Sequence, residues 1–354
     1  MGATACDDRY ETLEGHIERD RDTVIGLWRG NIGWQDQLDR MYEVFYRRCP
    51  FGRPQLRLLR HRASGEIVGT MGIGPRPMLW QGRETLVGCP SHLVVKIGHR
   101  SLKPAIGLVV DTANAGLGEF AFICDMTNAR GGAVCQRAGF AVPGRLLRHV
   151  KPLRYRNYGA RVLPGRLGRL GGTVVDGVLS GGRLLCAPLQ RTGLHARWTE
   201  DVDPRMEQLW ERSAHGRSLC TVRNTAMLRW RFLELPAVRR RFLLVTAAPD
   251  APLLAWFACE TNVRAPEFMT VTDAWFAEGV QGADRRAIRE LCRMARAANY
   301  DAIEVRLTAA PAVLDAWRAK GFIAHGDQPI FMHGVDHAVA DGTDLHITDI
   351  EQDG

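Results

Sequence analysis

The strongest constraint on the fold of this chain is an order of helix and strand patterns that occurs twice. In each half, two helical periods come first and three strand-like runs come next. They are followed by a helix, a short strand, another helix and a last strand. The last helix of each half ends in a Gly-Phe pair, at Gly139-Phe140 and Gly321-Phe322, where glycine takes a left-handed conformation and phenylalanine folds back into the core. An order repeated at ~180 residues indicates two copies of one fold.

The hydrophobic period also gives the bounds of the expected elements. In the first half, helices are expected at 22–30, 37–47, 104–116 and 129–138, and strands at 55–61, 66–74, 83–95, 120–125 and 140–150. In the second half, helices are expected at 204–214, 224–233, 283–299 and 311–320, and strands at 241–246, 253–260, 267–276, 302–307, 331–335 and 346–349. The expected fold is therefore α+β, with two tandem copies that are each a mixed, mostly antiparallel sheet flanked by helices. The expected domains are 1–153 and 198–354, joined by a basic Gly/Arg/Leu-rich linker at 154–197.

Composition excludes several classes of protein. Hydrophobic residues make up 45% and charged residues 24% of the chain, as in folded globular proteins. We find no run of ~18 uncharged apolar residues and no apolar segment of a secretory signal, so a cytoplasmic protein is expected. The nine cysteines are dispersed and contain no Cys-x-x-Cys, which predicts reduced thiols and no metal site.

The chain is basic, with 47 basic against 39 acidic residues and a net charge of +8. Only four of the basic residues are lysines, and the basic residues are scattered without a recognisable nucleic-acid-binding module, so no nucleic acid partner is expected. The arginines reflect either codon bias in a GC-rich genome or contacts with phosphate and anionic surfaces. The linker at 154–197 is either a helix packed across both domains or a basic amphipathic segment on a membrane surface.

Three short motifs stand in a consistent order. The strand that ends in Leu93-Val94-Val95 is followed by Arg100-x-x-Lys103-x-Ala105 at the start of a helix, and Asn128 precedes Gly139 by eleven residues. In the second half, Arg229-Trp230-Arg231-Phe232 precedes the first long strand. In order, spacing and duplication, these motifs resemble those of the GCN5-related N-acetyltransferase (GNAT) superfamily in its tandem form. The first motif of that family reads Gln/Arg-x-x-Gly-x-Gly/Ala. Its second motif places an asparagine eleven residues before the glycine of a Gly-Phe pair.

The resemblance implies an acyl-coenzyme A site in the first half, with acetyl-CoA or a longer acyl-CoA as co-substrate and no metal. The implied cofactor-binding residues are Val95, Arg100, Ser101, Leu102, Lys103, Ala105 and Asn128. Physical chemistry supports this site, because a loop that opens a helix presents free backbone N–H groups and the positive end of the helix dipole to pyrophosphate. Pro104 removes one of these N–H groups.

Direct attack of an amine on the thioester needs a base, donors for the oxyanion and an acid for the thiolate. The resemblance places the oxyanion donor at the backbone N–H of Val95 or its neighbour. At the position of the family's usual tyrosine acid this chain has Cys135, so the usual acid is absent. Cys135 is either a substitute for this acid or a small core residue. His92 is the best candidate for the base, because it lies three residues before Val95 and faces the other side of the strand; the alternative is a structural histidine.

Residues of the second half are candidates for the acceptor site. Asp273 and Glu278 flank the strand that corresponds to the motif strand, and we expect them to line an acceptor pocket. Trp230 either recognises the acceptor or packs between the domains.

The expected function is N-acyl transfer from acyl-CoA to a primary amine of a small-molecule or lipid-like acceptor. One alternative is long-chain acyl transfer to a lipid-like amine or amino acid, as some bacterial GNAT-like enzymes perform, with residues 154–197 docking the protein peripherally at the inner membrane. Aminoacyl transfer from tRNA is disfavoured by the scarcity of lysine. A further alternative is a catalytically degenerate module that binds CoA or a partner protein.

Overall fold

Two long strands, β6 (Ala141–Pro152) and β13 (Ile323–His333), run through both halves of the protein and join them. The computed structural model describes residues 7–32, 35–155, 192–234, 240–261 and 265–351. The predicted helix and membrane contact of the linker fall almost entirely on residues 156–191, which lie outside the described residues. Within the described ranges, no helix combines the length and the apolar character that crossing a membrane requires.

Apart from β1, which the sequence did not predict, the elements of the first half follow the expected order. They are β1 (Tyr10–Glu14), α1 (Arg21–Trp28), α2 (Leu38–Tyr42) with a π-helical turn η2 (Glu43–Arg47), β2 (Gln55–His61), β3 (Ile67–Trp80), β4 (Arg83–Val95), α3 (Leu102–Gly116), β5 (Ile123–Asp125), α4 (Ala129–Arg137) and β6. Strands β2 and β4 have the predicted bounds. Helix α3 begins two residues before the predicted start, so Pro104 is its third residue.

The second half has the same order of elements. They are β7 (His195–Thr199), α7 (Arg205–Arg212), α8 (Thr225–Arg229) with a π-helical turn η5 (Trp230–Glu234), β9 (Arg240–Thr246), β10 (Leu253–Thr261), β11 (Phe268–Phe276), α9 (Arg285–Ala297), β12 (Ala302–Thr308), α10 (Pro311–Arg318) and β13. Short elements outside this repeat are β8 (Cys220–Thr221), α11 (His337–Asp341), β14 (Ile347–Thr348) and η7 (Asp349–Glu351). Strand β7 begins inside the segment predicted as linker.

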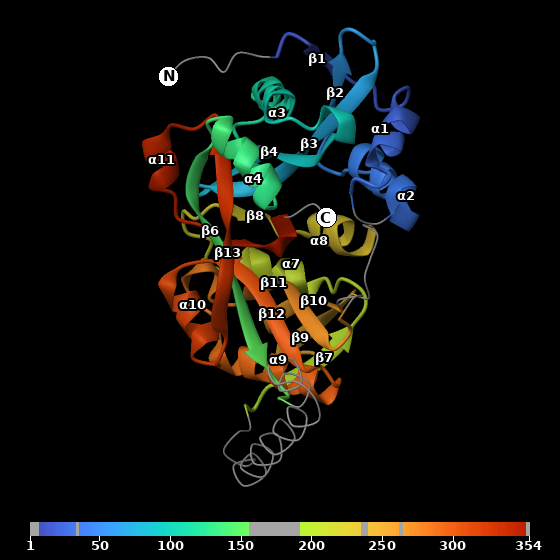
Figure 1. Cartoon of the computed structure of the whole chain (residues 1–354). Coiled ribbons are helices and arrows are strands. Elements are labelled where there is room, and N and C mark those ends of the chain that lie inside the picture. Colours follow the sequence, from blue (N-terminus) through green and yellow to red (C-terminus); the bar gives the residue numbers. More distant parts are fainter. Residues whose placement is uncertain (1–6, 33–34, 156–191, 235–239, 262–264, 352–354) are drawn as a thin grey trace.

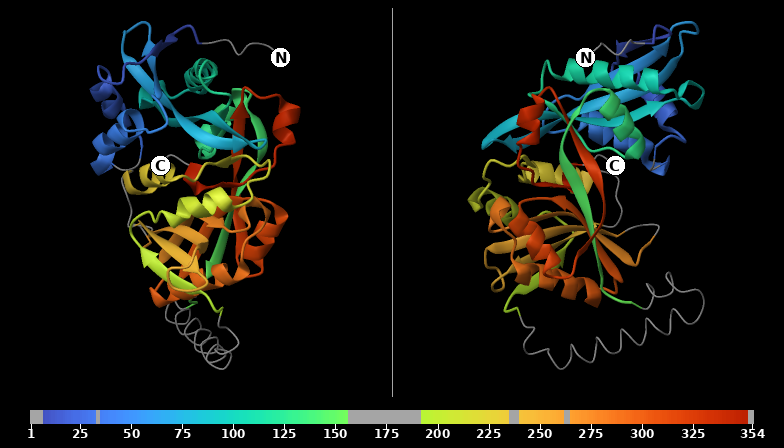
Figure 2. Two further views of the ribbon diagram at one scale, coloured as in Figure 1. Left: turned by 180° about the vertical axis from the view of Figure 1, so that it is seen from behind. Right: turned by 60° about the vertical axis from the view of Figure 1, so that its left-hand side comes forward.

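The two halves share one continuous mixed sheet of 14 strands among the described residues. Twelve of them follow one another in the order β1-β2-β3-β4-β5-β13-β6-β12-β11-β10-β9-β7. The other two lie off this path, where β8 pairs with β3 and β14 pairs with β12. Each half gives its last strand to the other: β13 pairs with β5 of the first half, and β6 pairs with β12 of the second. Figure 2 shows these two strands side by side across the junction. The expected α+β fold, a mixed sheet flanked by helices, is confirmed, and the sheets of the two halves join into one through the exchanged strands.

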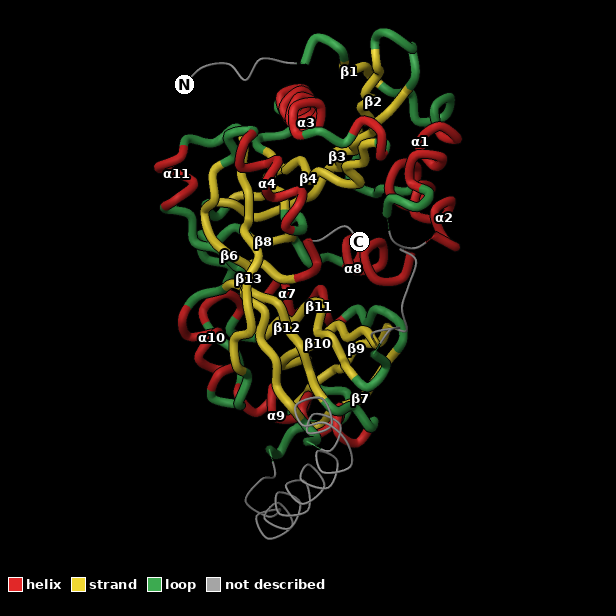
Figure 3. Tube along the Cα trace, viewed as in Figure 1, coloured by secondary structure: helices red, strands yellow, loops and turns green. Residues whose placement is uncertain are grey.

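Helices cover both faces of the sheet (Figure 3). In the first half, α3 and α4 pack on one face of the sheet through their buried side chains Leu108, Val109 and Val134. Helices α1 and α2 pack on the other face through an aromatic cluster that includes Trp28 and Tyr42. This second face is the one on which the candidate site lies.

Candidate active site

Strands β4 and β5 lie side by side for only a short distance. They pair in parallel at Gly88 and Ile123, where the Gly88 N–H donates to the Phe122 carbonyl at 3.0 Å. Gly88 has no room for a side chain, because a Cβ there would lie 2.5 Å from Phe120 and 2.8 Å from Ile123. Beyond Gly88, β4 continues to Val95 without a partner on β5. The first half of the sheet thus opens between these two strands.

Strand β4 also carries a β-bulge beyond the point where its pairing with β5 ends. Thr70 of β3 is opposite Val94, and Gly72 is opposite Ser91, so one residue of β3 opposes two of β4. His92 lies in the bulge with a left-handed φ of 56°. A bulge leaves backbone groups of the longer strand unpaired and redirects its side chains, which is why bulges are common next to active sites.

The imidazole of His92 belongs to the aromatic cluster on the α1 and α2 face. It stacks on Trp28 with ring centroids 4.4 Å apart and meets Phe45 edge to face at 5.1 Å. Its Nδ1 lies 2.7 Å from Ser91 Oγ. Val95 packs with α3 on the opposite face, so the prediction that His92 and Val95 face opposite sides of the strand is confirmed.

Tyr46 is a candidate that sequence reasoning missed. Its side chain, on the π-helical turn η2, is 3% exposed, and its hydroxyl has no hydrogen-bond partner among the described residues. A Cβ at Gly72 would lie 2.4 Å from that hydroxyl, so the hydroxyl rests directly on β3 opposite Ser91. Burial raises the pKa of Tyr46 well above its ordinary value. Buried polar groups without partners are rare, and each calls for an explanation.

Two further polar atoms on this face are unpartnered within the described ranges. They are Trp28 Nε1 and Thr70 Oγ1, and both side chains are fully buried. Thr70 lies two residues before Gly72 on β3 and therefore on the same face. The bulge is thus surrounded by donors and acceptors that the protein itself does not use. No sequence motif marks them, because their state depends on the packing of α1 and α2 against the sheet.

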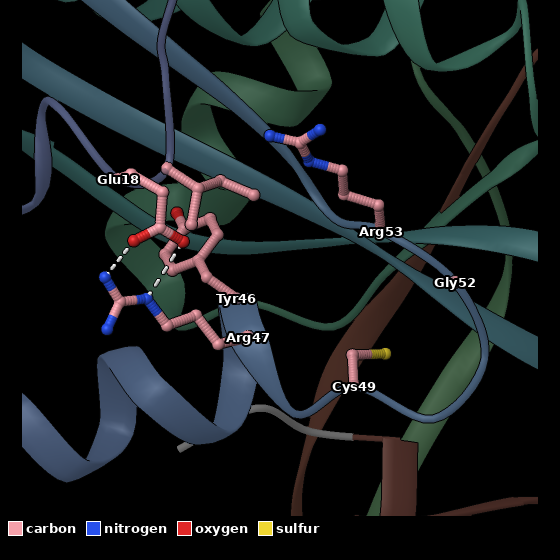
Figure 4. Close-up of a pocket in the computed structure, with 7 residues that line it drawn as sticks. Glu18, Tyr46, Arg47, Cys49, Gly52 and Arg53 are labelled. Atoms are coloured by element: carbon pink, nitrogen blue, oxygen red, sulfur yellow. Dashed lines mark hydrogen bonds and ion pairs between the residues drawn. The ribbon is translucent and has the colours of Figure 1, made fainter.

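A cavity of about 460 Å³ opens beside Tyr46. The side chains that line it include Glu18, Tyr46, Arg47, Cys49 and Arg53, together with the backbone of Gly52. Figure 4 shows Glu18, Tyr46 and Arg47 on one side of it and Cys49, Gly52 and Arg53 on the other. Arg47 Nε donates to Glu18 Oε1 at 3.1 Å, and Arg47 Nη2 pairs with Glu18 Oε2.

Most of the predicted cofactor-binding residues lie at the end of β4, in the loop that follows it and in the first turn of α3. Arg100 turns back onto this loop, where its Nε donates to the Val95 carbonyl at 2.9 Å and its Nη2 to Asn31. Ser101 is the N-cap of α3, and its side chain makes no capping hydrogen bond. Lys103 and Leu102 are exposed and Ala105 is half-buried in the first turn. The start of α3 therefore keeps backbone N–H groups available to an anion, although Pro104 contributes none.

The equivalent helix of the second half is capped differently. Asp284 precedes α9, and its carboxylate accepts a hydrogen bond from the Arg286 N–H at 2.7 Å. This negative charge occupies the place where an anion would bind. The first half alone thus has an uncapped helix after its bulged strand.

Asn128 and Cys135 have structural roles in α4. Asn128 Oδ1 caps the helix by accepting from the N–H groups of Arg130 and Gly131 at 3.0 and 3.2 Å. Cys135 is buried in the core, and its Sγ donates to Asp125 Oδ2 at 3.3 Å. Burial, with Asp125 nearby, raises the pKa of this thiol far above its usual range. So weak an acid is a poor proton donor to a thiolate, which favours the core interpretation of Cys135 over the catalytic one.

The candidates of the second half do not form an acceptor pocket. Asp273 is fully buried in a two-bond ion pair with Arg223, with both N–O distances 2.9 Å. Trp230 is buried between the halves, where its Nε1 donates to the Val44 carbonyl at 3.1 Å and the Arg76 guanidinium lies 4.1 Å over its ring. Glu278 is exposed in the turn after β11. The expectation for Asp273 is thereby corrected, and the packing interpretation of Trp230 is the one that fits.

The C-terminal segment occupies the corresponding opening of the second half. Strands β11 and β12 pair only from Phe268 to Val271, and β14 then pairs with Leu307 and Thr308 of β12. Because β6 takes the other side of β12, β14 lies on the side of β11. Arg231 donates to the carbonyls of Asp349 and Ile350 at 3.1 and 2.9 Å, which fixes the segment in place.

No group of three or more side chains suited to a metal ion is found within the described ranges. No protein-family model matches the sequence, and no curated protein matches it.

Solved structures do match the fold. A GCN5-related N-acetyltransferase from Anabaena variabilis is 9% identical, with 92% of this chain and 72% of that chain covered and a TM-score of 0.61. A GCN5-related N-acetyltransferase from Kribbella flavida is 12% identical, with 94% and 72% covered and a TM-score of 0.56. The Saccharomyces cerevisiae N-myristoyltransferase with bound myristoyl-CoA is 11% identical, with 92% and 79% covered and a TM-score of 0.54.

Proposed function

We propose that this chain, whose fold is that of the GCN5-related N-acetyltransferases, transfers an acyl group from acyl-coenzyme A to a primary amine. The observation that carries the proposal is the opening between β4 and β5, with a bulge on β4 beside it. The equivalent opening of the second half is filled by β14 and η7. The proposed co-substrate site therefore lies in the first half, and each chain holds one acyl-CoA.

The start of α3 is the proposed contact for the pyrophosphate. Its first-turn N–H groups and the positive end of a 15-residue helix attract an anion, and Ser101 leaves them uncapped. Lys103 adds an exposed positive charge. The yeast N-myristoyltransferase, which has the same fold, contains bound myristoyl-CoA, which supports an acyl-CoA as the co-substrate here.

In the proposed reaction, the amine nitrogen attacks the thioester carbon and the carbonyl electron pair moves onto the oxygen. A backbone N–H near the end of β4, at Val95 or its neighbour, stabilises this oxyanion. The intermediate then re-forms the carbonyl, the C–S bond breaks, and the thiolate leaves. The proton of the attacking amine passes to His92 Nε2 when its Nδ1–H is donated to Ser91 Oγ. Solvent returns a proton to the thiolate, because Cys135 is too weak an acid.

The test combines binding and turnover. We expect acyl-CoA to raise the melting temperature in a saturable way, by a few degrees at ~100 times its dissociation constant. Release of the CoA thiol should then require an added amine, and His92→Asn should lower kcat without changing the thermal shift. A panel from acetyl-CoA to palmitoyl-CoA assigns the acyl length. Binding without amine-dependent thiol release would instead support the degenerate CoA-binding module, and absence of binding would contradict both.

A further inference from the structure

We infer that the cavity beside Tyr46 binds the acceptor, and that the acceptor is an amine that also carries a carboxylate, as an amino acid does. This inference rests on the proposed function, because it names the acceptor of the same reaction. Three observations carry it: the position of Tyr46, the charge of the cavity and the state of Arg53.

Tyr46 connects the cavity to the bulge. Its ring lines the cavity, and its hydroxyl rests on Gly72, which is paired with Ser91 next to His92. A buried hydroxyl without a hydrogen-bond partner is unfavourable, so a ligand group that forms a hydrogen bond with it gains affinity. Tyr46 is thus the lining residue that lies between the cavity and the bulge, and an amine at this end of the cavity lies nearest to the bulge.

The cavity carries a net positive charge. Its lining contains one carboxylate, Glu18, and two guanidinium groups, Arg47 and Arg53. The charge of Arg47 is balanced by Glu18 and by Glu43, whose carboxylate oxygen lies 2.8 Å from Arg47 Nη1. Arg53 is exposed and has no hydrogen bond or ion pair with another described residue. It is therefore the group that remains to bind an anion from solution.

A carboxylate suits Arg53 because a guanidinium presents two parallel N–H donors to its two oxygens. Figure 4 shows Arg53 across the cavity from Glu18 and Tyr46. A ligand with a carboxylate at one end and an amine at the other thus spans the cavity, with the amine toward Tyr46. A volume of about 460 Å³ is that of a small-molecule site.

Cys49 provides a readout that does not depend on activity. It lines the cavity and is half-buried, whereas the six other cysteines of the described ranges are buried. A ligand in the cavity should therefore slow alkylation of Cys49 by N-ethylmaleimide, which peptide mass spectrometry measures at that residue alone. The probes are matched pairs that differ only in the carboxylate: phenylalanine with phenethylamine, and lysine with cadaverine.

We expect at least one amino acid to slow alkylation of Cys49 at least fivefold at millimolar concentration, and its decarboxylated partner to have no effect. Arg53→Ala should abolish this protection. Arg83→Ala, which removes an exposed arginine at the first position of β4, should retain it. Equal protection by both members of a pair, no protection by any probe, or protection that survives Arg53→Ala would each overturn the inference.

The thermal shift with acyl-CoA separates this inference from the proposed function. If acyl-CoA binds and no probe protects Cys49, the acceptor assignment fails and the acyl-CoA site stands. If an amino acid protects Cys49 in an Arg53-dependent way and acyl-CoA does not bind, the cavity stands as an amino acid site and the proposed transfer fails.

Discussion

Thr348 Oγ1 donates a hydrogen bond of 2.8 Å to Asp273 Oδ1, and this bond ties the C-terminal segment to β11. The same carboxylate holds the buried guanidinium of Arg223 through two bonds. A buried ion pair, together with the bonds from Arg231, thus fixes the segment that fills the opening of the second half. In the first half, no described strand pairs within the corresponding opening between β4 and β5.

Asp273→Asn should be strongly destabilising, because it leaves the charge of Arg223 buried without its partner. We expect a loss of about 3–5 kcal/mol in the free energy of unfolding, measured by urea denaturation. Asp315→Asn breaks an exposed pair with Arg318 and should cost less than ~1 kcal/mol. Equal losses for the two variants would show that the buried pair does not hold the segment.

Tyr46→Phe should separate stability from activity. The variant removes a buried hydroxyl that has no partner, so we expect the free energy of unfolding to rise by about 1 kcal/mol while kcat falls. Tyr42→Phe is the matched control, because the Tyr42 hydroxyl donates to the Ile17 carbonyl at 2.7 Å and its loss should lower stability by about the same amount. A Tyr46→Phe protein with lower stability and full activity would contradict a functional role.

The stability of the C-terminal segment should depend on pH through Asp349. Burial raises the pKa of Asp349 to about 7, against ~3.9 in the unfolded chain. The folded protein therefore keeps a proton that the unfolded chain has lost, and the free energy of unfolding falls as pH rises from about 4 to 7.

Asp349→Asn removes this dependence. Relative to the wild type, we expect the variant to gain about 3 kcal/mol between pH 5 and 8, as measured by urea denaturation at several pH values. Parallel curves for the two proteins would show that Asp349 is ionised in the folded state throughout this range.

The exchange of β6 and β13 makes each half incomplete. Residues 1–155 without β13 would leave an unpaired edge at β5, and β6 would lack both of its neighbours. We expect this fragment alone to show no cooperative thermal transition, and to co-purify as a folded complex when expressed with residues 192–354. A cooperative transition in the isolated fragment would contradict the exchange.

The sequence predicts the repeated order of elements and the bounds of β2 and β4, because both are local patterns of apolar residues. The exchange of strands is a pairing over a long separation, which no local pattern contains. Most of β13 was missed because its first residues, Ile323 to Asp327, are exposed and give no apolar alternation. Buried residues occur only near the end of β13, so only residues 331–335 were predicted as a strand.

Within the site, the sequence placed His92 and Ser101 where the structure has the bulge and the uncapped helix. Tyr46 was missed because its unpaired hydroxyl depends on the close approach of η2 to Gly72. Asp273 was misread because an acidic residue on a strand gives no sign of a buried arginine 50 positions away in the sequence.

Isothermal titration with acyl-CoA tests most directly whether one acyl-CoA binds per chain, in the first half. Ser101→Asp places at α3 the carboxylate that Asp284 places at α9, so it should repel the pyrophosphate while capping the helix well. We predict one site per chain, at least a tenfold loss of affinity (~1.4 kcal/mol) in Ser101→Asp, and no change in Asp284→Ser. Two sites per chain, or unchanged affinity in Ser101→Asp, would contradict the account.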